Sequence, residues 1–590
     1  MRPSVVVCLG LLVATAAQAQ DDVVGRAMRD ELARTMGSLR LNQLERPYFV
    51  SYSVEQEESV QATASYGSLL SSGASRGPRQ LSVEVRVGDY AFDNTNAIAM
   101  GRFGGFGLSM RTLEGSNTLP RDDNYREIRR RIWLSTDGAY KVALEELAAK
   151  RAALLNRTRS TPLADFSHET PTHTTDTTSS APVDRAAVED LARALSRVAT
   201  SPTVYGSRVT VSSMTSRQRY INSEGTEYVV ARPLVMVTAR ASMQATDGAR
   251  LFDEIEFYAR RFDGLPPRDE LTTRVRAMLT RLDSLRTAPV LERYNGPVLF
   301  IGQAAGDLFA NAFAFALIGQ RPYVIDNPQA EAMMSEMMRG SSFADKLGGR
   351  VLPEFMRVVD DPTAMIANGV PLFGGYAVDV EGVRARPTVV VDSGVLKTLL
   401  TSRQPVDGVD HSTGNRRGWG TEPSNLIVSA TNGVTDSALV QQMLALVKRR
   451  GLPYGVIVRA LAQPSSDITE MMSSIEPDRA GRQRIGAMGA YRIYPDGHEE
   501  LVRGASLTEF GTSDFKDIIA VSNTPTVLTA GGMPVAIGGS GRSMMMSEFD
   551  FDSDYGVPVS LVVPSLLFDD LSLAARPGAR PSPPISAPPT

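Results

Sequence analysis

The sequence predicts an α+β protein with two domains: a mixed α/β N-terminal domain, followed by a mainly antiparallel β C-terminal domain that also contains helices. Three observations lead to this prediction. The chain of 590 residues is too long for one hydrophobic core. Segments of helical and strand periodicity alternate in its first half. Its second half is richer in strand signals. We expect the domains over residues 20–290 and 291–572.

The first 19 residues have the features of a secretory signal peptide. Arg2 gives a positive start, residues 5–14 form an apolar run too short to cross a bilayer, and residues 17–19 read Ala-Gln-Ala, a small-residue cleavage sequence. The single cysteine, Cys8, lies in the segment that cleavage removes. We therefore predict an exported protein, periplasmic or extracellular, whose mature chain has no disulfide and no thiolate ligand.

Hydrophobic periodicity predicts the elements of the N-terminal domain. Apolar residues at four-residue spacing, beginning with Val24 and Met28, favour an amphipathic helix at its start. The predicted helices cover residues 22–39, 140–155, 184–198 and 268–286. Alternation of apolar and polar residues predicts strands over residues 48–56, 81–87, 209–214 and 228–239.

Two segments of this domain have the composition of loops. Residues 65–77 are rich in Gly and Ser and are expected to be a mobile loop. Residues 157–182 are rich in Thr and Ser and have almost no large apolar side chains, which predicts an exposed loop. We place the domain boundary near residues 286–296, where a predicted helix ends before Gly296-Pro297.

The C-terminal domain begins with a predicted helix that runs to Leu317. Strands over residues 387–391 and 395–400 are expected to form a hairpin, and further strands are expected over 425–429 and 454–460. A helix is predicted over residues 435–450, with Thr435 as its N-cap and Gly451 just past its end. Residues 573–590 form a Pro-rich tail that should be disordered.

Composition excludes several classes of function. A formal net charge of -4 is small for this length and argues against nucleic acid as the main partner. No segment after the signal peptide has the roughly 18 unbroken apolar residues of a membrane span. Only four histidines occur, which limits zinc binding and histidine-based catalysis.

Six segments in the second half, taken in order, resemble the C-terminal domain of the TldD/PmbA metallopeptidase family. The family-like segments are Asp379 to Thr388 continuing through Ser393 to Lys397 and Leu400 to Arg403, then Ser412 to Asn415, Pro423 to Asn425, Val502 to Ala505, Ile519 to Asn523 and Gly556 to Val559. Each segment alone is a weak signal, but their order over about 180 residues is not expected by chance. If the family resemblance is set aside, these segments are simply turns and the starts of strands. They therefore indicate a fold more clearly than a catalytic mechanism.

The resemblance implies a zinc site that this sequence lacks. Active members carry HExxxH on a helix, with a cysteine near the GVPV segment as a further ligand. Aligned with this chain, the histidine positions hold Gly302 and Asp307, the glutamate position holds Gln303, and the cysteine position falls near Asp550. Gly302 has no side chain, and the Gln303 amide cannot act as a base. We expect no catalytic residue at these positions and no cofactor, with zinc confined to relatives whose motif is intact.

One literal HExxxH occurs elsewhere, from His168 to His173. Pro171 inside it would break the helix that must present both imidazoles, so we interpret it as a chance match. The acidic run Glu548, Asp550, Asp552 and Asp554 could bind a hard cation, although a solvated loop is the simpler interpretation. The G-x-S-x-G sequence at residues 73–77 lies in a predicted loop, away from the strand-to-helix turn that such a nucleophile needs.

The absent motif is typical of the PmbA-like (TldE) subunits of the family, which complete a heterodimeric protease that admits unfolded peptides. The resemblance therefore favours a non-catalytic subunit whose partner is a TldD-like homologue with intact HExxxH, or a second copy of itself. The residues that could line a cleft or bind peptide are Ser412, Thr413, Gly414, Asn415, Ser424 and Asn425. Two alternatives stay open: a metallopeptidase with an atypical site built from Asp307 and the acidic run, and an exported binding or scaffold protein.

Overall fold

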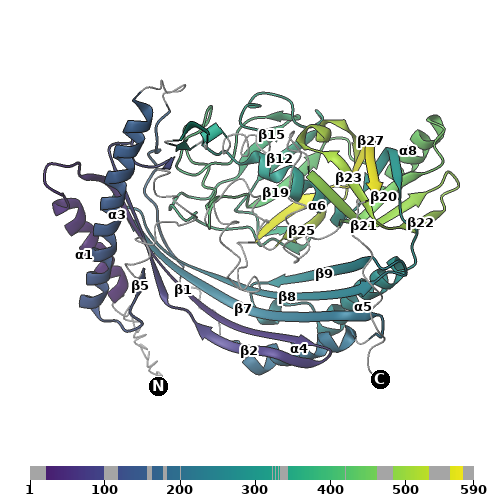
Figure 1. Cartoon of the computed structure of the whole chain (residues 1–590), viewed down its shortest axis with the longest axis horizontal. Coiled ribbons are helices and arrows are strands. Elements are labelled where there is room, and N and C mark those ends of the chain that lie inside the picture. Colours follow the sequence, from purple (N-terminus) through teal and green to yellow (C-terminus); the bar gives the residue numbers. More distant parts are fainter. Residues whose placement is uncertain are drawn as a thin grey trace, which may run out of the picture.

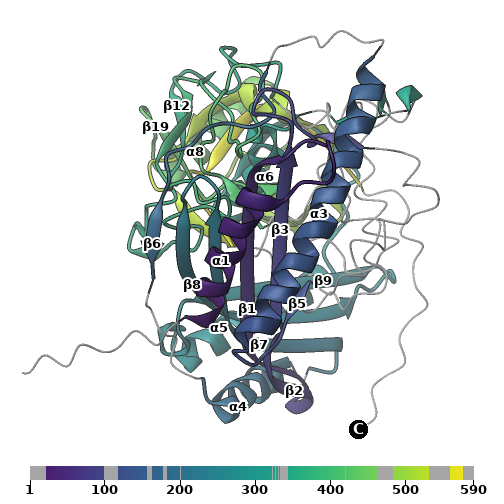
Figure 2. The same ribbon diagram turned by 90° about the vertical axis from the view of Figure 1, so that its left-hand side faces the viewer.

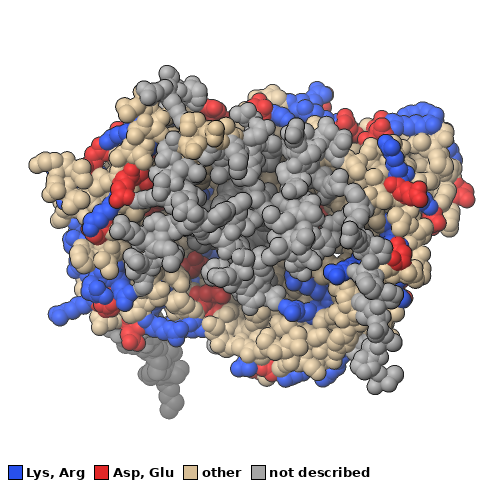
Figure 3. All heavy atoms as spheres, viewed as in Figure 1, with Lys and Arg blue, Asp and Glu red and all other residues tan. Residues whose placement is uncertain are grey.

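The computed structural model describes residues 22–98, 117–155, 163–176, 183–199, 201–321, 323–325, 327–329, 331–332, 343–418, 420–461, 483–530 and 558–575. Sheets and helices occur in both halves, which confirms the α+β class. None of the helices in this part of the chain combines the length and apolarity needed to cross a membrane. On the face drawn in Figure 3, positive and negative side chains are interspersed.

The first half is built on an eight-stranded sheet with the order β5-β3-β1-β7-β8-β6, in which β2 pairs with β1 and β9 with β8. Its long strands curve beneath the second half of the chain (Figure 1). The strands are β1 (Pro47–Ser65), β2 (Ser68–Arg76), β3 (Arg79–Val87), β5 (Thr118–Leu119), β6 (His173–Thr175), β7 (Val204–Asn222), β8 (Glu227–Gln244) and β9 (Arg250–Ala259).

Four helices cover this sheet. The helices α4 (Arg185–Ser196) and α5 (Arg268–Leu285) pack on apolar side chains of β7 and β8, such as Val211 and Val237. The helices α1 (Val23–Ser38) and α3 (Tyr125–Leu154) lie side by side at one end of the sheet (Figure 2). Helix α3 begins earlier than predicted because the Asn124 side chain accepts a hydrogen bond from the Glu127 amide as an N-cap. All four helices confirm predicted segments.

The second half contains two larger sheets. The seven-stranded sheet runs β10-β20-β21-β23-β27-β24, with β22 on β21, and β10 also pairs with β27 so that five strands close a ring. Its strands are β10 (Arg293–Phe300), β20 (Gly455–Leu461), β21 (Gln483–Ile493), β22 (Glu499–Val502), β23 (Ala505–Phe510), β24 (Ile518–Val521) and β27 (Leu566–Ala575).

The six-stranded sheet runs β16-β15-β12-β19-β26-β25. Among the described pairs of the two sheets, β10 with β20 and β19 with β26 are parallel and the others antiparallel, which confirms the mainly antiparallel character. The strands of this sheet are β12 (Met356–Asp360), β15 (Thr388–Asp392), β16 (Val395–Leu396), β19 (Asn425–Ala430), β25 (Thr526–Ala530) and β26 (Val559–Val563).

Shorter elements complete the second half. Helix α6 (Gln303–Ala312) continues into the 3-10 turn η4 (Ala314–Leu317), and helix α8 is Asp436–Arg449. Thr435 caps α8, as predicted, by accepting a hydrogen bond from the Ala438 amide. The remaining strand pairs are β4 (Ala97–Ile98) with β11 (Val324–Ile325), β13 (Ile366–Ala367) with β14 (Val370–Pro371), and β17 (Arg416–Arg417) with β18 (Gly420–Thr421).

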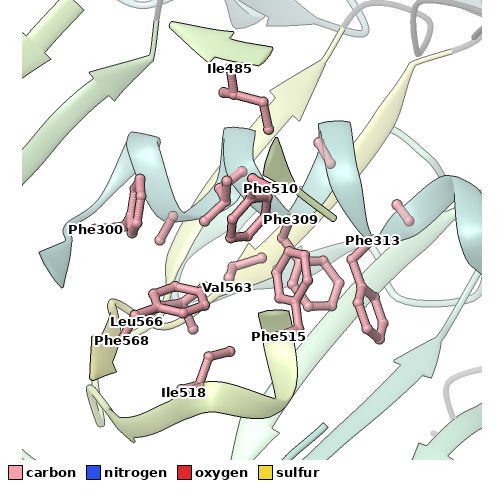
Figure 4. Packing of buried hydrophobic residues seen from close by; sticks show 14 of the residues in the cluster. Phe300, Phe309, Phe313, Ile485, Phe510, Phe515, Ile518, Val563, Leu566 and Phe568 are labelled. Atoms are coloured by element: carbon pink, nitrogen blue, oxygen red, sulfur yellow. The ribbon is translucent and has the colours of Figure 1, made fainter. Parts of the chain in front are cut away.

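Helix α6 lies at the centre of the main core. Phe309 on α6 and Phe313, the residue between α6 and η4, contact Phe515, and Phe515 contacts Phe568 of β27 (Figure 4). These rings are fully buried with aliphatic side chains from both sheets. Because the two sheets pack on this one helix, the positions at its beginning are held rigidly by the core.

Two predicted loops differ from the structure. Residues 68–76, expected to be part of a mobile loop, form β2, which pairs antiparallel with β1. Within the predicted exposed loop 157–182, the described residues 163–176 include buried Asp165 and Phe166 and end in β6. The predicted signal peptide and the acidic run at 548–554 lie outside the described residues, as do residues 576–590 of the predicted Pro-rich tail. Residues 573–575 of that predicted tail belong instead to strand β27, where they pair with neighbouring strands.

The segment 163–176 lies where the two halves of the chain meet. The guanidinium of Arg403 donates to both carboxylate oxygens of Glu224, at 2.6 and 2.8 Å, and to the Ser167 carbonyl. The ring of Phe166 lies between Arg403, 3.8 Å from its centroid, and Arg86, at 3.6 Å. Arg403 therefore ties a β7–β8 turn of the first half to the family-like segment of the second.

Candidate functional site

The site predicted from the family alignment lies at the start of α6. Gly302 immediately precedes the helix with φ 60° and ψ -123°, a conformation that favours glycine. Gly306 faces β25, where an added Cβ would stand 3.1 Å from the Leu528 side chain. The two glycines thus permit the sharp entry into the helix and its close packing on the six-stranded sheet.

Asp307 is the one ionisable side chain among the three aligned helix positions. It is 7% exposed, and its Oδ2 has no hydrogen-bond partner among the described residues. Burial raises the pKa of Asp307 to about 7; the nearby Glu256 raises it further, and a hydrogen bond with the Gln303 side chain acts in the opposite direction. The fold therefore holds a carboxyl group whose charge is poorly compensated.

The space beside Gly302 is open toward β25. A Cβ added to Gly302 would meet, within 4 Å, only the Oγ1 of Thr526, at 3.9 Å, among the described atoms. Gln303 and Asp307 are four residues apart on α6, so their side chains lie on the same face of the helix. The amide and the carboxyl thus lie along one face of α6.

The predicted loop from Ser412 to Asn415 is buried within the second half. The Asn415 Nδ2 donates to the carboxylate of Asp360 at 2.7 Å, and the Ser424 amide donates to the same carboxylate at 2.7 Å. Thr413 exchanges hydrogen bonds with Thr401 and donates to the Asn415 Oδ1. Gly414 has φ 81°, as its predicted turn requires. These polar groups organise the fold, and peptide contact by this loop stays a prediction.

Asn425 holds the base of an exposed hairpin. Its Nδ2 donates to the carbonyls of Asp361 and Ala364, and its Oδ1 accepts from the Gly374 amide. Ser424 and Asn425 are both fully buried, and the Oγ of Ser424 has no partner among the described residues. These two residues position neighbouring backbone, and their proposed role in peptide binding also stays a prediction.

The literal HExxxH at residues 168–173 is not on a helix. His168 is exposed and stacks on Tyr90 with ring centroids 3.5 Å apart, while His173 begins strand β6. Glu169 between them accepts a hydrogen bond from the Ser412 amide. We interpreted this match as accidental, and the absence of a helix over residues 168–173 agrees with that interpretation. Asp550, the predicted cysteine position, lies outside the described residues.

Glu256 is the residue near the site that the sequence did not indicate. It lies on β9 of the first half, and the Tyr258 hydroxyl donates to its carboxylate at 2.6 Å. No periodicity or motif links β9 to α6, since their proximity arises only when the C-terminal domain packs over the curved sheet. Within the described residues, no group of three or more His, Cys, Asp or Glu side chains is placed to hold a metal ion.

The fold and the degenerate helix entry define a metallopeptidase-like protein. Residues 293–575 match the sequence profile of the PmbA/TldA metallopeptidase C-terminal domain. The second half of this chain is therefore a C-terminal domain of the TldD/PmbA family.

Curated relatives match over a short segment. A metalloprotease of Methanocaldococcus jannaschii is 42% identical over 85 residues, which is 14% of this chain and 18% of the relative. A metalloprotease of Methanothermobacter thermautotrophicus is 38% identical over 90 residues, 15% of this chain and 18% of the relative. The matched segment therefore spans less than a fifth of the length of these relatives.

Solved structures share the fold over nearly the whole chain. A candidate modulator of DNA gyrase from Bacteroides thetaiotaomicron aligns with a TM-score of 0.56 at 12% identity, covering 94% of this chain and 98% of its own. TldE from Thermococcus kodakarensis aligns with a TM-score of 0.53 at 12% identity, covering 94% and 100%. At these identities the likeness concerns the fold.

The residues at the family's metal position do not fit zinc. A hydrolytic zinc site takes about three protein ligands. Gly302 offers none, Gln303 offers an uncharged amide, and Asp307 offers one carboxyl group. This donor set differs from two imidazoles and a glutamate at every position, so these three residues do not reproduce the family's hydrolytic zinc site.

Proposed function

We propose that this chain is a non-catalytic, TldE-like subunit of an exported peptide-processing complex. The observation that carries the proposal is the donor set at the start of α6, where the family alignment predicts metal-binding and catalytic residues and this chain has Gly302, Gln303 and Asp307. A fold retained through a rigid phenylalanine core, combined with loss of the zinc ligands, supports a role in binding and assembly.

The proposed partner is a TldD-like homologue that carries HExxxH on the corresponding helix. The alignment with a TldE structure over 94% of this chain supports this choice, since that likeness reaches both halves of the molecule. Export, to the periplasm or beyond the cell, is part of the proposal on the basis of the signal-like first 19 residues. The partner would then need a signal peptide of its own.

Zinc content and peptidase activity test the non-catalytic role. The purified exported chain, dialysed against metal-free buffer, is expected to hold far less than one zinc per chain and to leave an unstructured peptide such as β-casein fragments uncleaved. About one zinc per chain, with cleavage that a chelator abolishes, would refute the proposal in favour of an atypical metallopeptidase.

Co-expression tests the partner. The chain should co-purify with an exported homologue bearing HExxxH, and the pair should cleave peptide. A matched complex in which the homologue's motif glutamate is changed to glutamine should assemble but not cleave, because only the base has been removed. If the homologue cleaves equally well alone and never associates with this chain, the scaffold alternative replaces the subunit role.

A further inference from the structure

We propose that the outer face of helix α3, formed by Arg126, Arg130, Trp133 and Leu134, docks on an anionic lipid bilayer. In this arrangement the indole and leucine side chains enter the interfacial layer of the bilayer, and the arginines contact lipid phosphates. The inference goes beyond the proposed function and needs neither zinc nor a partner subunit. It concerns the first half of the chain, outside the residues that match the family domain.

Two large apolar side chains are exposed next to each other on α3. Trp133 is 45% exposed and Leu134 is 42% exposed, although tryptophan is on average a well-buried residue. Arg126, Arg130 and Trp133 follow one another at intervals of four and three residues, so they form one stripe along the helix. Ile132 on the opposite side of α3 is fully buried in the core beneath it. The stripe therefore faces away from the sheet.

The loop after α1 adds apolar surface beside α3. Leu41 is 41% exposed and Leu44 is 47% exposed. The loop is fixed to α3 because the Leu41 amide donates to the Tyr140 hydroxyl at 3.3 Å, and that hydroxyl donates to the Glu45 carbonyl at 2.6 Å. Tyr140 lies about two helical turns after Trp133. Exposed apolar side chains thus accompany α3 over these turns, at the end of the molecule where α1 and α3 lie side by side (Figure 2).

Arginines outnumber acids around this apolar surface. Residues 125–134 contain four arginines and a single acid, Glu127. The Glu127 carboxylate is shared, since it accepts hydrogen bonds from Arg130 and from Arg131, each at 2.8 Å. Arg130 keeps 53% of its side-chain surface exposed in this pair, and Arg126 is exposed as well. A guanidinium has five N–H groups, so both arginines retain donors for phosphate oxygens.

The charge at the start of α3 is opposite to what a helix prefers there. The N-terminal end of a helix carries partial positive charge and favours acids. Glu127 is the acid in the first turn of α3, and the four arginines lie within its first two turns. Of the two acids just before the helix, Asp123 is paired with Arg79 at 2.8 Å, and Asp122 is exposed. Such a departure from local preference is typical of a functional surface.

An anionic bilayer accounts for the apolar and the basic side chains together. Tryptophan is enriched at membrane interfaces, and basic residues near the surface are attracted to anionic headgroups. A soluble polyanion would contact the arginines but leave the indole and leucine side chains in water. Because α3 lies outside the sheet at one end of the molecule (Figure 2), its stripe can meet a flat surface.

Tryptophan fluorescence of the full-length chain tests the docking directly. The chain has two tryptophans, so Trp419→Phe leaves Trp133 as the single reporter. Vesicles of equal parts phosphatidylglycerol and phosphatidylcholine should shift its emission to shorter wavelength, and brominated lipid should quench it, because the indole enters the interfacial layer. Pure phosphatidylcholine vesicles and inorganic phosphate should leave the emission unchanged. These two controls separate a charged bilayer from an apolar surface alone and from phosphate alone.

Sedimentation with the same vesicles measures the contribution of the arginines. Arg130→Glu should weaken binding roughly 20-fold, because the change removes one positive charge and adds a negative one at the membrane surface. Arg274→Glu is the matched control. Arg274 is also an exposed helical arginine, with 65% of its side chain accessible, and it pairs with Glu270 on its own helix. The control changes the net charge equally and should leave binding nearly unchanged.

The same assay measures the apolar contribution. Trp133→Ala should weaken binding roughly tenfold, because the buried indole area is lost. Leu70→Ala on strand β2, where Leu70 is 59% exposed, is the apolar control and should have no effect. Melting curves establish that each variant is folded. Raising the salt concentration should weaken the binding of the unaltered chain, since salt screens surface charge.

Several results would overturn the inference. They are equal binding to pure phosphatidylcholine vesicles, an unshifted Trp133 emission, and equal weakening by Arg130→Glu and Arg274→Glu. If Arg130→Glu and Trp133→Ala instead abolish co-purification with the HExxxH homologue while vesicles do not bind, this face is a protein interface and the bilayer inference is wrong. The vesicle measurements use the chain alone, so their failure leaves the zinc and peptidase tests of the proposed function unaffected.

Discussion

Two buried aspartates in the second half of the chain differ in how their charge is met. Burial raises the pKa of both, to about 6 for Asp360 and about 7 for Asp307. Asp360 accepts hydrogen bonds from the Asn415 side chain and the Ser424 amide, which favour its charged form. Asp307 keeps one oxygen without a described partner.

This difference distinguishes the segments that match the family from the helix entry that departs from it. The segments that match the family, around Asn415 and Ser424, are held in a closed hydrogen-bond network and maintain the fold. The helix entry that departs from the family has an acid with one oxygen that lacks a partner among the described residues. A sequence can therefore retain the scaffold of an enzyme while the catalytic positions become free for other chemistry.

The largest effect is expected for Arg403→Met, which breaks the ion pair between the two halves of the chain. This substitution leaves Glu224, only 15% exposed at its side chain, without its guanidinium partner and removes the ring contact with Phe166. Breaking a buried ion pair from one side costs about 3 to 5 kcal/mol. Urea denaturation should show this loss, whereas Arg261→Met, whose partner Asp263 is exposed, should leave the midpoint nearly unchanged because solvent screens the exposed pair. Equal effects would mean that the interface does not depend on Arg403.

Asp360→Ala examines the bonded member of the aspartate pair. The substitution leaves the Asn415 amide and the Ser424 N–H buried without their acceptor, and we expect a loss of about 3 kcal/mol. Asp283→Ala is a suitable control, because Asp283 is exposed on α5 and contacts only Arg286 in the next turn. A loss near that of the control would show that solvent replaces the missing carboxylate.

The sequence predicted elements where local signals are strong. Thr435 and Gly451 mark the two ends of α8, and the apolar spacing of Val24 and Met28 marks α1. Strand β2 was wrongly predicted as part of a loop because it is an edge strand with mostly exposed side chains, so it lacks apolar alternation. Its pairing is set by the turn at Tyr66 and Gly67, both with positive φ, and by β1 across it.

The site could be predicted only in part. The alignment located Gly302, Gln303 and Asp307, because a motif is local in sequence. The burial of Asp307 depends on the packing of two sheets around α6, and its neighbour Glu256 comes from a strand of the other half. Neither is encoded in a pattern near Asp307, so the sequence alone could not indicate an uncompensated charge.

Asp307→Asn is expected to act in the opposite direction from Asp360→Ala. The folded protein retains a proton on Asp307 up to about pH 7, whereas the unfolded chain loses it near the ordinary pKa of 3.8. Wild-type stability therefore falls as pH rises between these values. The neutral variant avoids this loss, so it should be about 2 kcal/mol more stable at pH 8 and gain little at pH 4. Denaturation at both pH values measures the difference, and a destabilised variant at pH 8 would indicate an unrecognised partner for the charge.

The smallest effect concerns the backbone at the helix entry. Gly302→Ala adds a methyl group that meets only Thr526 Oγ1, at 3.9 Å among the described atoms, so its cost comes from φ 60° rather than from crowding. We expect a loss of about 1 to 2 kcal/mol in the free energy of unfolding.

Gly138→Ala is the matched control, since Gly138 lies in the middle of α3 with no described atom within 4 Å of an added Cβ. In a regular helix the same change should stabilise by about 0.5 to 1 kcal/mol. Opposite signs for the two variants in urea denaturation would establish that the entry of α6 requires glycine. A stabilising Gly302→Ala would mean that the helix entry relaxes to an ordinary conformation, and the positive φ at Gly302 would then not be required by the packing of α6.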